Sequence, residues 1–301
     1  MATGVPDLGR GSGGGGGHGG GGGHGGGGGG FRLDGGEPGP LAGGLSFAVF
    51  GDCRPANLGQ TSGYPSAIIG SIFTLAQKLN VQFVVGTGDY MFADNQTDVD
   101  AQVALFQQAE ANFTAGPIYL TMGNHECTGA TASNCPNLNE TPNVQAFMTK
   151  LLPSGSTLPY YRIDQDTPMG KAKFLFVAAN AWSTTQQTWL TQQLADPTTY
   201  TFIARHEPAA TTDAPGVTPS EQVMQGGPYT LALLGHSHEY RHVDTKHVIS
   251  GNAGAPLSTG NYGLLLVQQQ TNGNITVTEY DQASGAPLDL WSVTPDGQPA
   301  P

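Results

Sequence analysis

Short apolar runs, rich in β-branched and aromatic residues, recur along the chain, and each is followed by a glycine with a polar residue or directly by a histidine. Runs of this length that are bounded by turn residues are typical of buried strands. The pattern predicts strands over residues 45–50, 81–85, 117–121, 200–205 and 230–234. Each predicted strand is therefore expected to present a polar side chain at its carboxyl end.

Stretches with helical periodicity separate the predicted strands. Strands that alternate with helices pair in parallel through crossover connections, so the sequence predicts an α/β core. Ser183 is a suitable N-cap for the last predicted helix. The predicted helices cover residues 67–79, 98–112, 144–152 and 184–194.

The pattern changes beyond His238. Residues 247–250, 262–268 and 275–280 have the composition of strands, and Asn272-Gly273 is a favoured sequence for a tight hairpin turn. We therefore expect the chain to finish in antiparallel β structure.

Glycine tracts, broken only by His18 and His24, dominate residues 1–44. Such a segment has little to bury and would lose much backbone entropy on ordering, so it is predicted to be a disordered linker. Residues 45–293 can form one domain with a sizeable core, because 38% of the chain is apolar. Residues 294–301 are rich in proline and are expected to form a flexible tail.

The formal charge of −12 argues against a nucleic-acid-binding surface, since such a surface needs basic residues. An acidic protein that acts on anionic esters requires a local positive centre, and bound metal ions would supply one. The sequence contains no apolar run of about 18 residues, so no membrane span is predicted. Residues 1–10 lack the basic and apolar regions of a secretory signal, and the sequence carries no signal for an oligomeric state.

Cys127 and Cys135 flank a short polar segment. A disulfide between them would remove about 2.5 kcal/mol of denatured-state entropy by the loop-closure estimate. It would also indicate an oxidising, extracytoplasmic location, periplasmic or secreted. The alternative is a pair of unlinked thiols in a cytoplasmic protein. Cys53 follows a predicted strand and is expected to be packed rather than reactive.

Polar residues that can bind a metal stand after the predicted strands, where ligand sites of open α/β sheets form. Their mixture of carboxylate, amide and imidazole groups suits iron, manganese or zinc better than calcium. Two metals about 4 Å apart can clamp a phosphate and activate a bridging hydroxide for in-line attack. Each residue by itself is weak evidence for a metal site, but the order of these residues along the chain is strong evidence. The residues are Asp52, Asp89, Asn124, His125, His206, His236 and His238.

This succession of motifs over residues 45–282 resembles the calcineurin-like metallophosphoesterase family. The segments 88–94 and 235–240 also resemble the purple acid phosphatase branch. The resemblance implies a four-layer αββα sandwich, in which two mixed β-sheets are covered by helices, and two divalent or trivalent metal ions. The motifs are Gly51-Asp52, Gly88-Asp89, Gly123-Asn124-His125-Glu126, Ala204-Arg205-His206-Glu207 and Gly235-His236-Ser237-His238.

The resemblance also implies a role for each of these residues. Asp89 would bridge both metals. Asn124, His206 and His236 would complete the site of one metal, and Asp52 and His238 would bind the other. His125 would lie beside the phosphate and would give a hydrogen bond or a proton to the leaving oxygen, which suits an imidazole near neutral pH.

The sequence departs from the family at position 54. The usual first motif is Gly-Asp-x-His, but Arg54 stays protonated and cannot bind a metal. Phe92 stands where purple acid phosphatases have a tyrosine ligand, and Tyr90 is expected to point elsewhere. The first metal therefore keeps three evident ligands, which can still form a catalytic site. Arg54 is expected either to contact the substrate phosphate or to form a surface salt bridge.

The function implied is metal-dependent hydrolysis of a phosphate ester, either a phosphomonoester or a phosphodiester, by a metal-activated hydroxide. His125 and Arg54 are the predicted catalytic residues. Because of Arg54, a degenerate, non-catalytic module that binds metal or phosphate is the alternative. A third hypothesis, an interaction protein on a glycine-rich stalk, rests only on residues 1–44.

Overall fold

The structure is a computed structural model that describes residues 40–128, 135, 141–211 and 214–300. The chain divides into two units, residues 1–37 and 38–301, and the second contains all the described residues. Most of the predicted linker lies outside the described residues. Residues 40–44 lead into the first strand, with the backbone N–H of Leu41 donating to the carbonyl of Gln269 at 2.8 Å.

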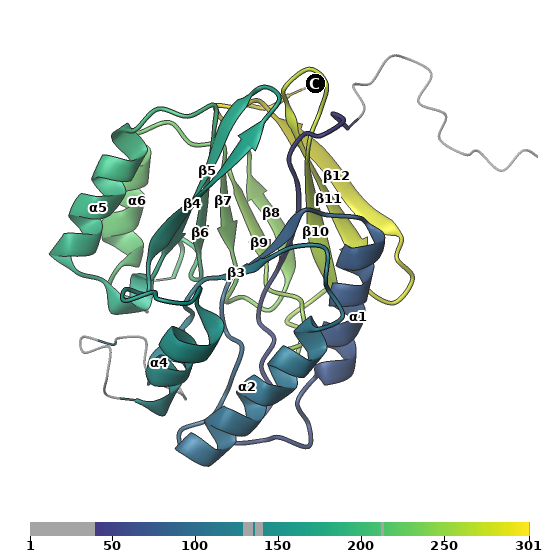
Figure 1. Cartoon of the computed structure of the whole chain (residues 1–301), viewed down its shortest axis with the longest axis vertical. Helices are drawn as coiled ribbons and strands as arrows, with labels where there is room; N and C mark the ends of the chain where they lie inside the picture. Colours follow the sequence, from purple (N-terminus) through teal and green to yellow (C-terminus); the bar gives the residue numbers. More distant parts are fainter. Residues whose placement is uncertain (1–39, 129–134, 136–140, 212–213, 301) are drawn as a thin grey trace, which may run out of the picture. The chain divides into compact units, whose positions relative to one another are not determined.

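Two six-stranded sheets form the centre of this unit (Figure 1). In the first sheet β1, β2 and β3 are parallel, while β10 joins β1 in antiparallel orientation and β11 and β12 continue antiparallel. Its strand order is β12 (Pro287–Val293), β11 (Ile275–Asp281), β10 (Gly263–Gln269), β1 (Ser46–Phe50), β2 (Phe83–Gly86) and β3 (Ile118–Leu120).

The second sheet is also mixed. Its strands β5, β6, β7 and β9 are parallel, and an antiparallel strand closes each edge. Its strand order is β4 (Tyr161–Thr167), β5 (Gly170–Val177), β6 (Tyr200–Arg205), β7 (Leu231–Leu234), β9 (His247–Ser250) and β8 (Tyr240–Asp244).

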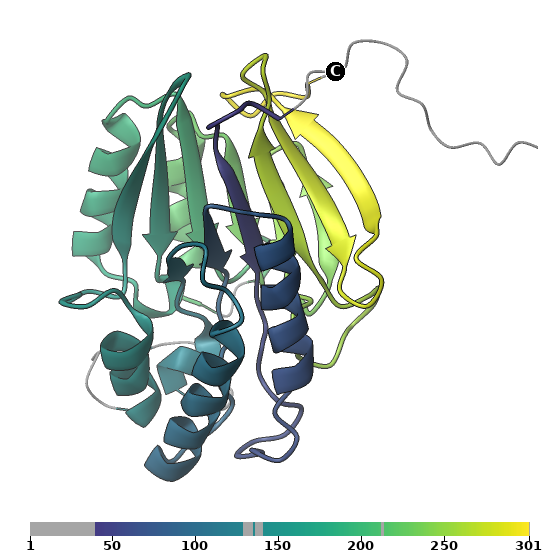
Figure 2. The same ribbon diagram turned by 45° about the vertical axis from the view of Figure 1, so that its right-hand side comes forward.

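Helices cover the outer face of each sheet (Figures 1 and 2). α1 and α2 pack on the first sheet, and α5 and α6 pack on the second. In the described part of the chain, no helix is both long and apolar enough to cross a membrane. The helices are α1 (Ser66–Lys78), α2 (Gln96–Glu110), α3 (Asn124–Thr128), α4 (Pro142–Ala146), which continues into the π-helical turn η1 (Phe147–Leu151), the 3-10 turn η2 (Ala179–Ala181), α5 (Thr184–Ala195) and α6 (Val217–Gln225).

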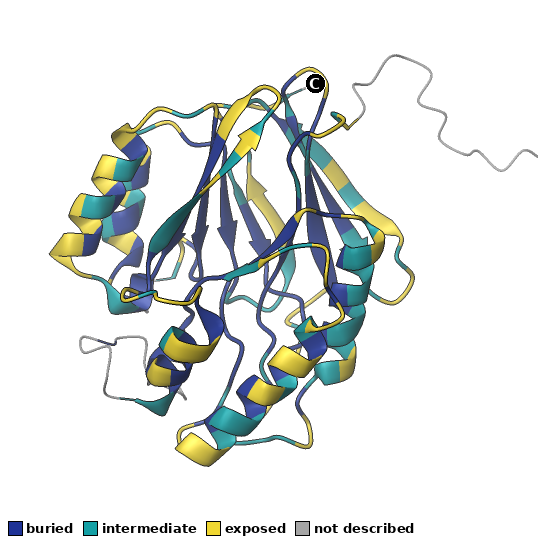
Figure 3. Ribbon diagram, viewed as in Figure 1, coloured by how far each residue is buried: buried dark blue, intermediate teal, exposed yellow. Residues whose placement is uncertain are grey.

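Alternating side chains along each central strand build the layers. Phe47 of β1 and Phe202 of β6 point into the core between the two sheets, where their rings lie 5.2 Å apart. Phe50 of β1 packs against the helices of the first sheet, and Ile203 of β6 packs against those of the second. Both faces of the central strands are buried, as Figure 3 shows. The predicted αββα sandwich with two mixed sheets is confirmed.

The structure corrects several predicted elements. β4, β5, β8, β12 and α6 were not predicted. β4 and β8 are edge strands with few buried side chains, so they lack the apolar run that marked the central strands. The antiparallel ending is confirmed for β10–β12, and its hairpin has Gly273 at φ +88°. β9 lies inside the second sheet, where it pairs antiparallel with β8 but in parallel with β7.

Residues 294–300 fold back on the domain. The backbone N–H of Ala300 donates to the carbonyl of Ser292 at 3.1 Å, and the N–H of Thr294 donates to the carbonyl of Gln298 at 2.9 Å. The flexibility expected for residues 294–301 stays a prediction, as do the domain boundaries at 44 and 293.

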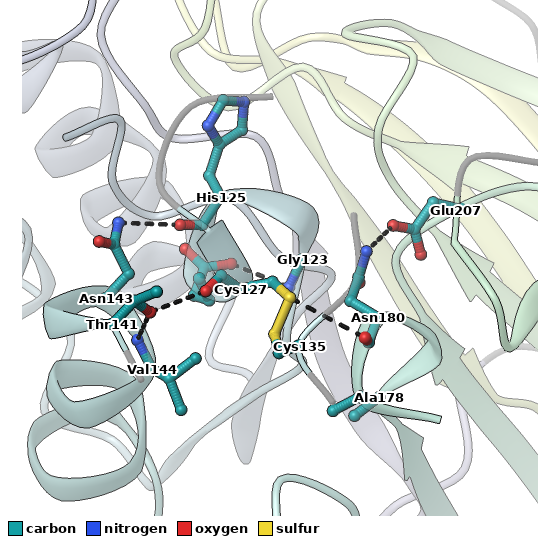
Figure 4. Close-up of a disulfide and its surroundings, with 12 residues drawn as sticks. Gly123, His125, Cys127, Cys135, Thr141, Asn143, Val144, Ala178, Asn180 and Glu207 are labelled. Atoms are coloured by element: carbon teal, nitrogen blue, oxygen red, sulfur yellow. Dashed lines mark hydrogen bonds between the residues drawn. A yellow bond between two sulfur atoms is a disulfide. The ribbon is translucent and has the colours of Figure 1, made fainter. Parts of the chain in front are cut away.

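A disulfide links Cys127 to Cys135, with their Cα atoms 5.3 Å apart (Figure 4). Both cysteines are buried, and Cys127 lies on α3, two residues after His125. The sequence left a disulfide and two unlinked thiols as alternatives, and the structure contains the disulfide. Cys53 is a buried free thiol, as expected.

The disulfide predicts the thiol count of the purified protein. Unfolded without reductant, the chain should react with one equivalent of a thiol reagent, because only Cys53 is free. After reduction, all three cysteines should react. The Cys53→Ser protein is the control and should give none before reduction. Three reactive thiols in the unreduced protein would contradict the bridge.

Candidate metal centre

All the candidate ligands lie at the carboxyl ends of strands, and both sheets contribute them. Asp52 follows β1, Asp89 follows β2 and Asn124 begins α3 after β3, whereas His206 follows β6 and His236 and His238 follow β7. Hydrogen bonds join the two sets directly, among them one from the backbone N–H of His236 to Asp52 Oδ2 at 2.8 Å. The structure thus brings together all six predicted metal ligands.

The backbone of these loops is strained. Among the described residues, five that are not glycine have a positive φ, and four of them are candidate ligands: Asp52 (57°), Asp89 (62°), His236 (74°) and His238 (51°). Left-handed backbone is uncommon for such residues and concentrates at functional sites. Here it turns the ligand side chain inward immediately after the strand has ended.

Glycines next to the ligands allow the loops to approach each other closely. A Cβ atom on Gly88 would lie 2.4 Å from His206 Nδ1, and one on Gly123 would lie 2.3 Å from Asp89 Oδ1. Both contacts are impossible, so the glycine before each acid or amide is required by packing. This explains why the Gly-Asp and Gly-Asn motifs were informative in the sequence.

Four donor atoms form the first group, which we call the first ligand group: Asp89 Oδ2, Asn124 Oδ1, His206 Nε2 and His236 Nδ1. His206 Nε2 lies 3.3 Å from Asp89 Oδ2 and 3.1 Å from Asn124 Oδ1. His236 Nδ1 lies 3.2 Å from Asn124 Oδ1 and 3.3 Å from His206 Nε2. Ligands about 2.1 Å from one metal ion stand roughly 3.0–3.4 Å apart, so these residues fit a single bound ion.

The tautomer of His206 suits metal binding. Its Nδ1 lies 2.8 Å from the carbonyl oxygen of Thr87, which can only accept, so Nδ1 carries the proton and Nε2 faces the first ligand group. Burial disfavours a charged His206, but the carboxylates of Asp89, Asp52 and Glu207 together outweigh burial and raise the pKa of His206 well above its ordinary value. The carboxylates around the metal-free site therefore favour a second proton on His206, at Nε2.

The second ligand group consists of Asp52, Asp89 and His238, whose donor atoms lie within 4.8 Å of one another. Asp52 Oδ1 is 3.5 Å from His238 Nε2 and has no hydrogen-bond partner among the described residues. Burial raises the pKa of Asp52 well above its usual range. Burial acts in the same direction on Asp89, but His206 and other cationic neighbours outweigh it, and the pKa of Asp89 is lowered.

Arg54 lies against the second ligand group. Its Nη2 is 3.3 Å from His238 Nε2, and its Nε is 3.9 Å from Asp89 Oδ2. Its guanidinium carbon lies 4.8 Å from the centre of the Phe92 ring. Burial, and then the charge of Arg54, lower the pKa of His238 to about 4. The fit to a metal is therefore poorer here, because a guanidinium already contacts two of only three ligands.

His125 lies beside the shared carboxylate. Its Nε2 is 3.6 Å from Asp89 Oδ2, and its ring packs edge-on against Phe92 at 4.6 Å between centroids. Its backbone N–H donates to Asp89 Oδ1 at 3.1 Å, and its carbonyl accepts from Asn143 Nδ2 at 3.0 Å (Figure 4). The ring is thus fixed at the edge of both groups. Tyr90 points into the core, as expected.

Glu126 holds two of the ligand loops together, a role that was not predicted from the sequence. Its buried carboxylate accepts the backbone N–H groups of Asp89 at 2.8 Å, Tyr90 at 2.7 Å and Gly123 at 2.8 Å. Burial and the nearby Asp89 raise the pKa of Glu126 to about 7, although these three donors act in the opposite direction. In the sequence, the position of Glu126 in the Gly-Asn-His-Glu motif was the one signal that pointed to this role.

Glu207 was also missed. It is buried and lies with His206 and His236 in a group that could hold a metal. Its Oε1 accepts from Asn180 Nδ2 at 2.6 Å, while Oε2 has no hydrogen-bond partner among the described residues (Figure 4). An orphaned buried carboxylate oxygen is unfavourable unless a cation or donor reaches it, which supports a metal at the first ligand group.

A profile of the calcineurin-like phosphoesterase family matches residues 45–240. The chain belongs to this family. A search of curated proteins found no match. Metal binding is a property of this family. The two ligand groups and the sandwich of two sheets therefore agree with the family membership.

Several solved structures, two of them of phosphatases, have a similar fold. A purple acid phosphatase from yellow lupin (Lupinus luteus) aligns with a TM-score of 0.62 and 16% identity, covering 83% of this chain and 53% of the lupin chain. This chain thus spans about half the length of that protein. A dimetal phosphatase from Danio rerio aligns with a TM-score of 0.57 and 13% identity, over 84% of this chain and 100% of that one. PhoD aligns with a TM-score of 0.55 and 12% identity, over 87% and 72%.

Metal binding at the first ligand group should release protons. The metal must displace the proton that Asp89 favours on His206, so the apparent affinity should rise with pH, about tenfold per pH unit for each proton released, at pH values below the raised pKa of His206. Calorimetric titration with Mn²⁺ in two buffers of different ionisation enthalpy measures this release. An affinity that does not change with pH, with no buffer dependence, would contradict the proposed protonation of His206.

Proposed function

We propose that this protein is a metal-dependent phosphoesterase, which hydrolyses a phosphomonoester or a phosphodiester at the two ligand groups. The observation that carries the proposal is the first ligand group, whose four donor atoms lie 3.1–3.3 Å from their neighbours. Family membership and the phosphatase folds support the same class of reaction. When bound, a divalent or trivalent ion, iron, manganese or zinc, would polarise the phosphoryl group and lower the pKa of water.

The chain's own residues would position the substrate and move the protons. Asp89 belongs to both ligand groups, so it fixes the distance between them. Arg54 and His125 both lie within 4 Å of its Oδ2 atom, and both pack against the Phe92 ring. Arg54 offers a planar fork of N–H donors to phosphoryl oxygens, and His125 can protonate the departing alkoxide.

A non-catalytic module that binds metal or phosphate is the second candidate. The contact between Arg54 Nη2 and His238 Nε2 favours it, because it engages a nitrogen that a second metal would need. A single bound metal does not by itself exclude hydrolysis, since many catalytic sites use one metal that keeps a position for water. Turnover therefore decides between the two candidates.

We also propose that the protein works in an oxidising compartment, outside the cytoplasm. The disulfide between Cys127 and Cys135 supports this, because such bridges are rare where thiols are kept reduced. The bridge ties α3, which carries Asn124 and His125, to residue 135. Loss of the bridge under reducing conditions should therefore loosen this part of the centre.

Hydrolysis is tested directly with metal-loaded protein and chromogenic phosphomonoesters and phosphodiesters. Activity should disappear with a chelator and return with manganese, iron or zinc. The His236→Ala protein should be inactive, because it lacks a donor of the first ligand group. If the metal-loaded wild-type protein cleaves neither class of ester, the non-catalytic candidate replaces the proposed function.

The role of His125 gives a sharper prediction. His125→Ala should lower kcat by about 10²–10⁴-fold, while the metal content stays the same. The loss should be larger for an alkyl phosphate than for a nitrophenyl phosphate, whose leaving group needs no proton. His242→Ala is the control, because that exposed ring stacks on Trp291 and contacts no ligand. An equal loss for both substrates would contradict proton donation.

A further inference from the structure

The two ligand groups are not equivalent. The first has four donors that face one another, with Glu207 beside them. The second has three donors and a permanent cation, Arg54, in contact with two of them. The asymmetry comes from the chain itself, since Arg54 stands where the family pattern has a histidine.

The tautomer of His238 shows how Arg54 competes with a metal. His238 Nδ1 lies 3.0 Å from the carbonyl oxygen of Pro256, so Nδ1 carries the proton and donates it there. The lone pair on Nε2 then accepts a hydrogen bond from Arg54 Nη2 at 3.3 Å. A metal bound by His238 would use this same lone pair. Metal binding therefore requires the guanidinium to leave.

The surroundings of Arg54 hold it in this position. Its Nη1 donates to the carbonyl of Pro55 at 3.1 Å, and its guanidinium carbon stacks 4.8 Å from the centre of the Phe92 ring. The side chain is only 16% exposed, so solvent screens its charge weakly. A guanidinium does not lose its proton in proteins, so it cannot become neutral to admit a second cation.

We propose that the Arg54 guanidinium takes the place of the second metal, so that this protein binds one metal ion tightly, through Asp89, Asn124, His206 and His236. The guanidinium supplies positive charge beside Asp89 that a second ion would otherwise provide. Phe92 completes the replacement, because its apolar ring offers a surface for a cation and no ligand for a metal. The inference rests on the metal binding proposed above and is independent of hydrolysis.

The test is the number of metal ions bound per chain. The full-length protein, with His18 and His24 replaced by alanine so that the glycine tracts cannot retain metal, is equilibrated with Mn²⁺ and desalted. Elemental analysis should then give one ion per chain, and electron paramagnetic resonance should show isolated Mn²⁺. Two tightly bound ions with a spin-coupled spectrum would overturn the proposal.

Two alanine variants locate the ion. His236→Ala should reduce the metal content to near zero, whereas His238→Ala should leave it at one. A site with two metals would instead lose one ion in the His238→Ala protein. These variants decide the question without any change at position 54.

Arg54→His reverses the replacement. It removes the guanidinium and adds an imidazole, so the metal content should rise from one ion to two and the spectrum should become spin-coupled. Arg241→His is the matched control, because it exchanges an arginine with a 51% exposed side chain and should stay at one ion. A folded Arg54→His protein that still binds one ion would overturn the proposal. Metal content decides this inference, and turnover of phosphate esters decides the proposed function.

Discussion

Two carboxylates, Asp52 and Asp89, are buried together where the two sheets meet, and the rest of the centre depends on compensating their charge. An unpaired buried carboxylate costs several kcal/mol even after relaxation. The strained loops and the glycines beside them bring imidazole and amide groups around these acids, and Glu126 ties the loops of Asp89 and Gly123 to each other. The geometry is that of a cation site, built from strand ends that the two hydrophobic layers hold in place.

The two halves of the site satisfy this requirement by different means. In one half His206 and His236 offer lone pairs to a metal ion, next to a carboxylate oxygen of Glu207 that has no partner among the described residues. In the other half Arg54 is a covalent part of the chain and brings its charge permanently. A fixed guanidinium is always present, but it cannot activate water as a metal does. Metal-assisted hydrolysis would therefore take place at the first ligand group, with His125 at its edge.

The sequence predicted the sandwich and the strands that precede all six candidate ligands, because each of these strands is a short apolar run that ends close to a ligand. It did not reveal β4 and β8, because these edge strands have few buried side chains and lack a continuous apolar run. Glu126 and Glu207 stood inside recognised motifs, but their roles depend on which backbone N–H groups and side chains the fold brings to them. The direction of Arg54 was equally hidden, since it follows from contacts with His238 and Phe92 that lie far away along the chain.

The most direct measurement is a crystal structure of the protein grown with Mn²⁺, with diffraction recorded at the manganese absorption edge. The anomalous difference map should contain one strong peak within about 2.0–2.3 Å of Asp89, Asn124, His206 and His236, as expected for a first-row metal with oxygen and nitrogen ligands. The Arg54 guanidinium should remain against His238. A second peak of similar height bound by Asp52 and His238, with Arg54 turned away, would contradict the account.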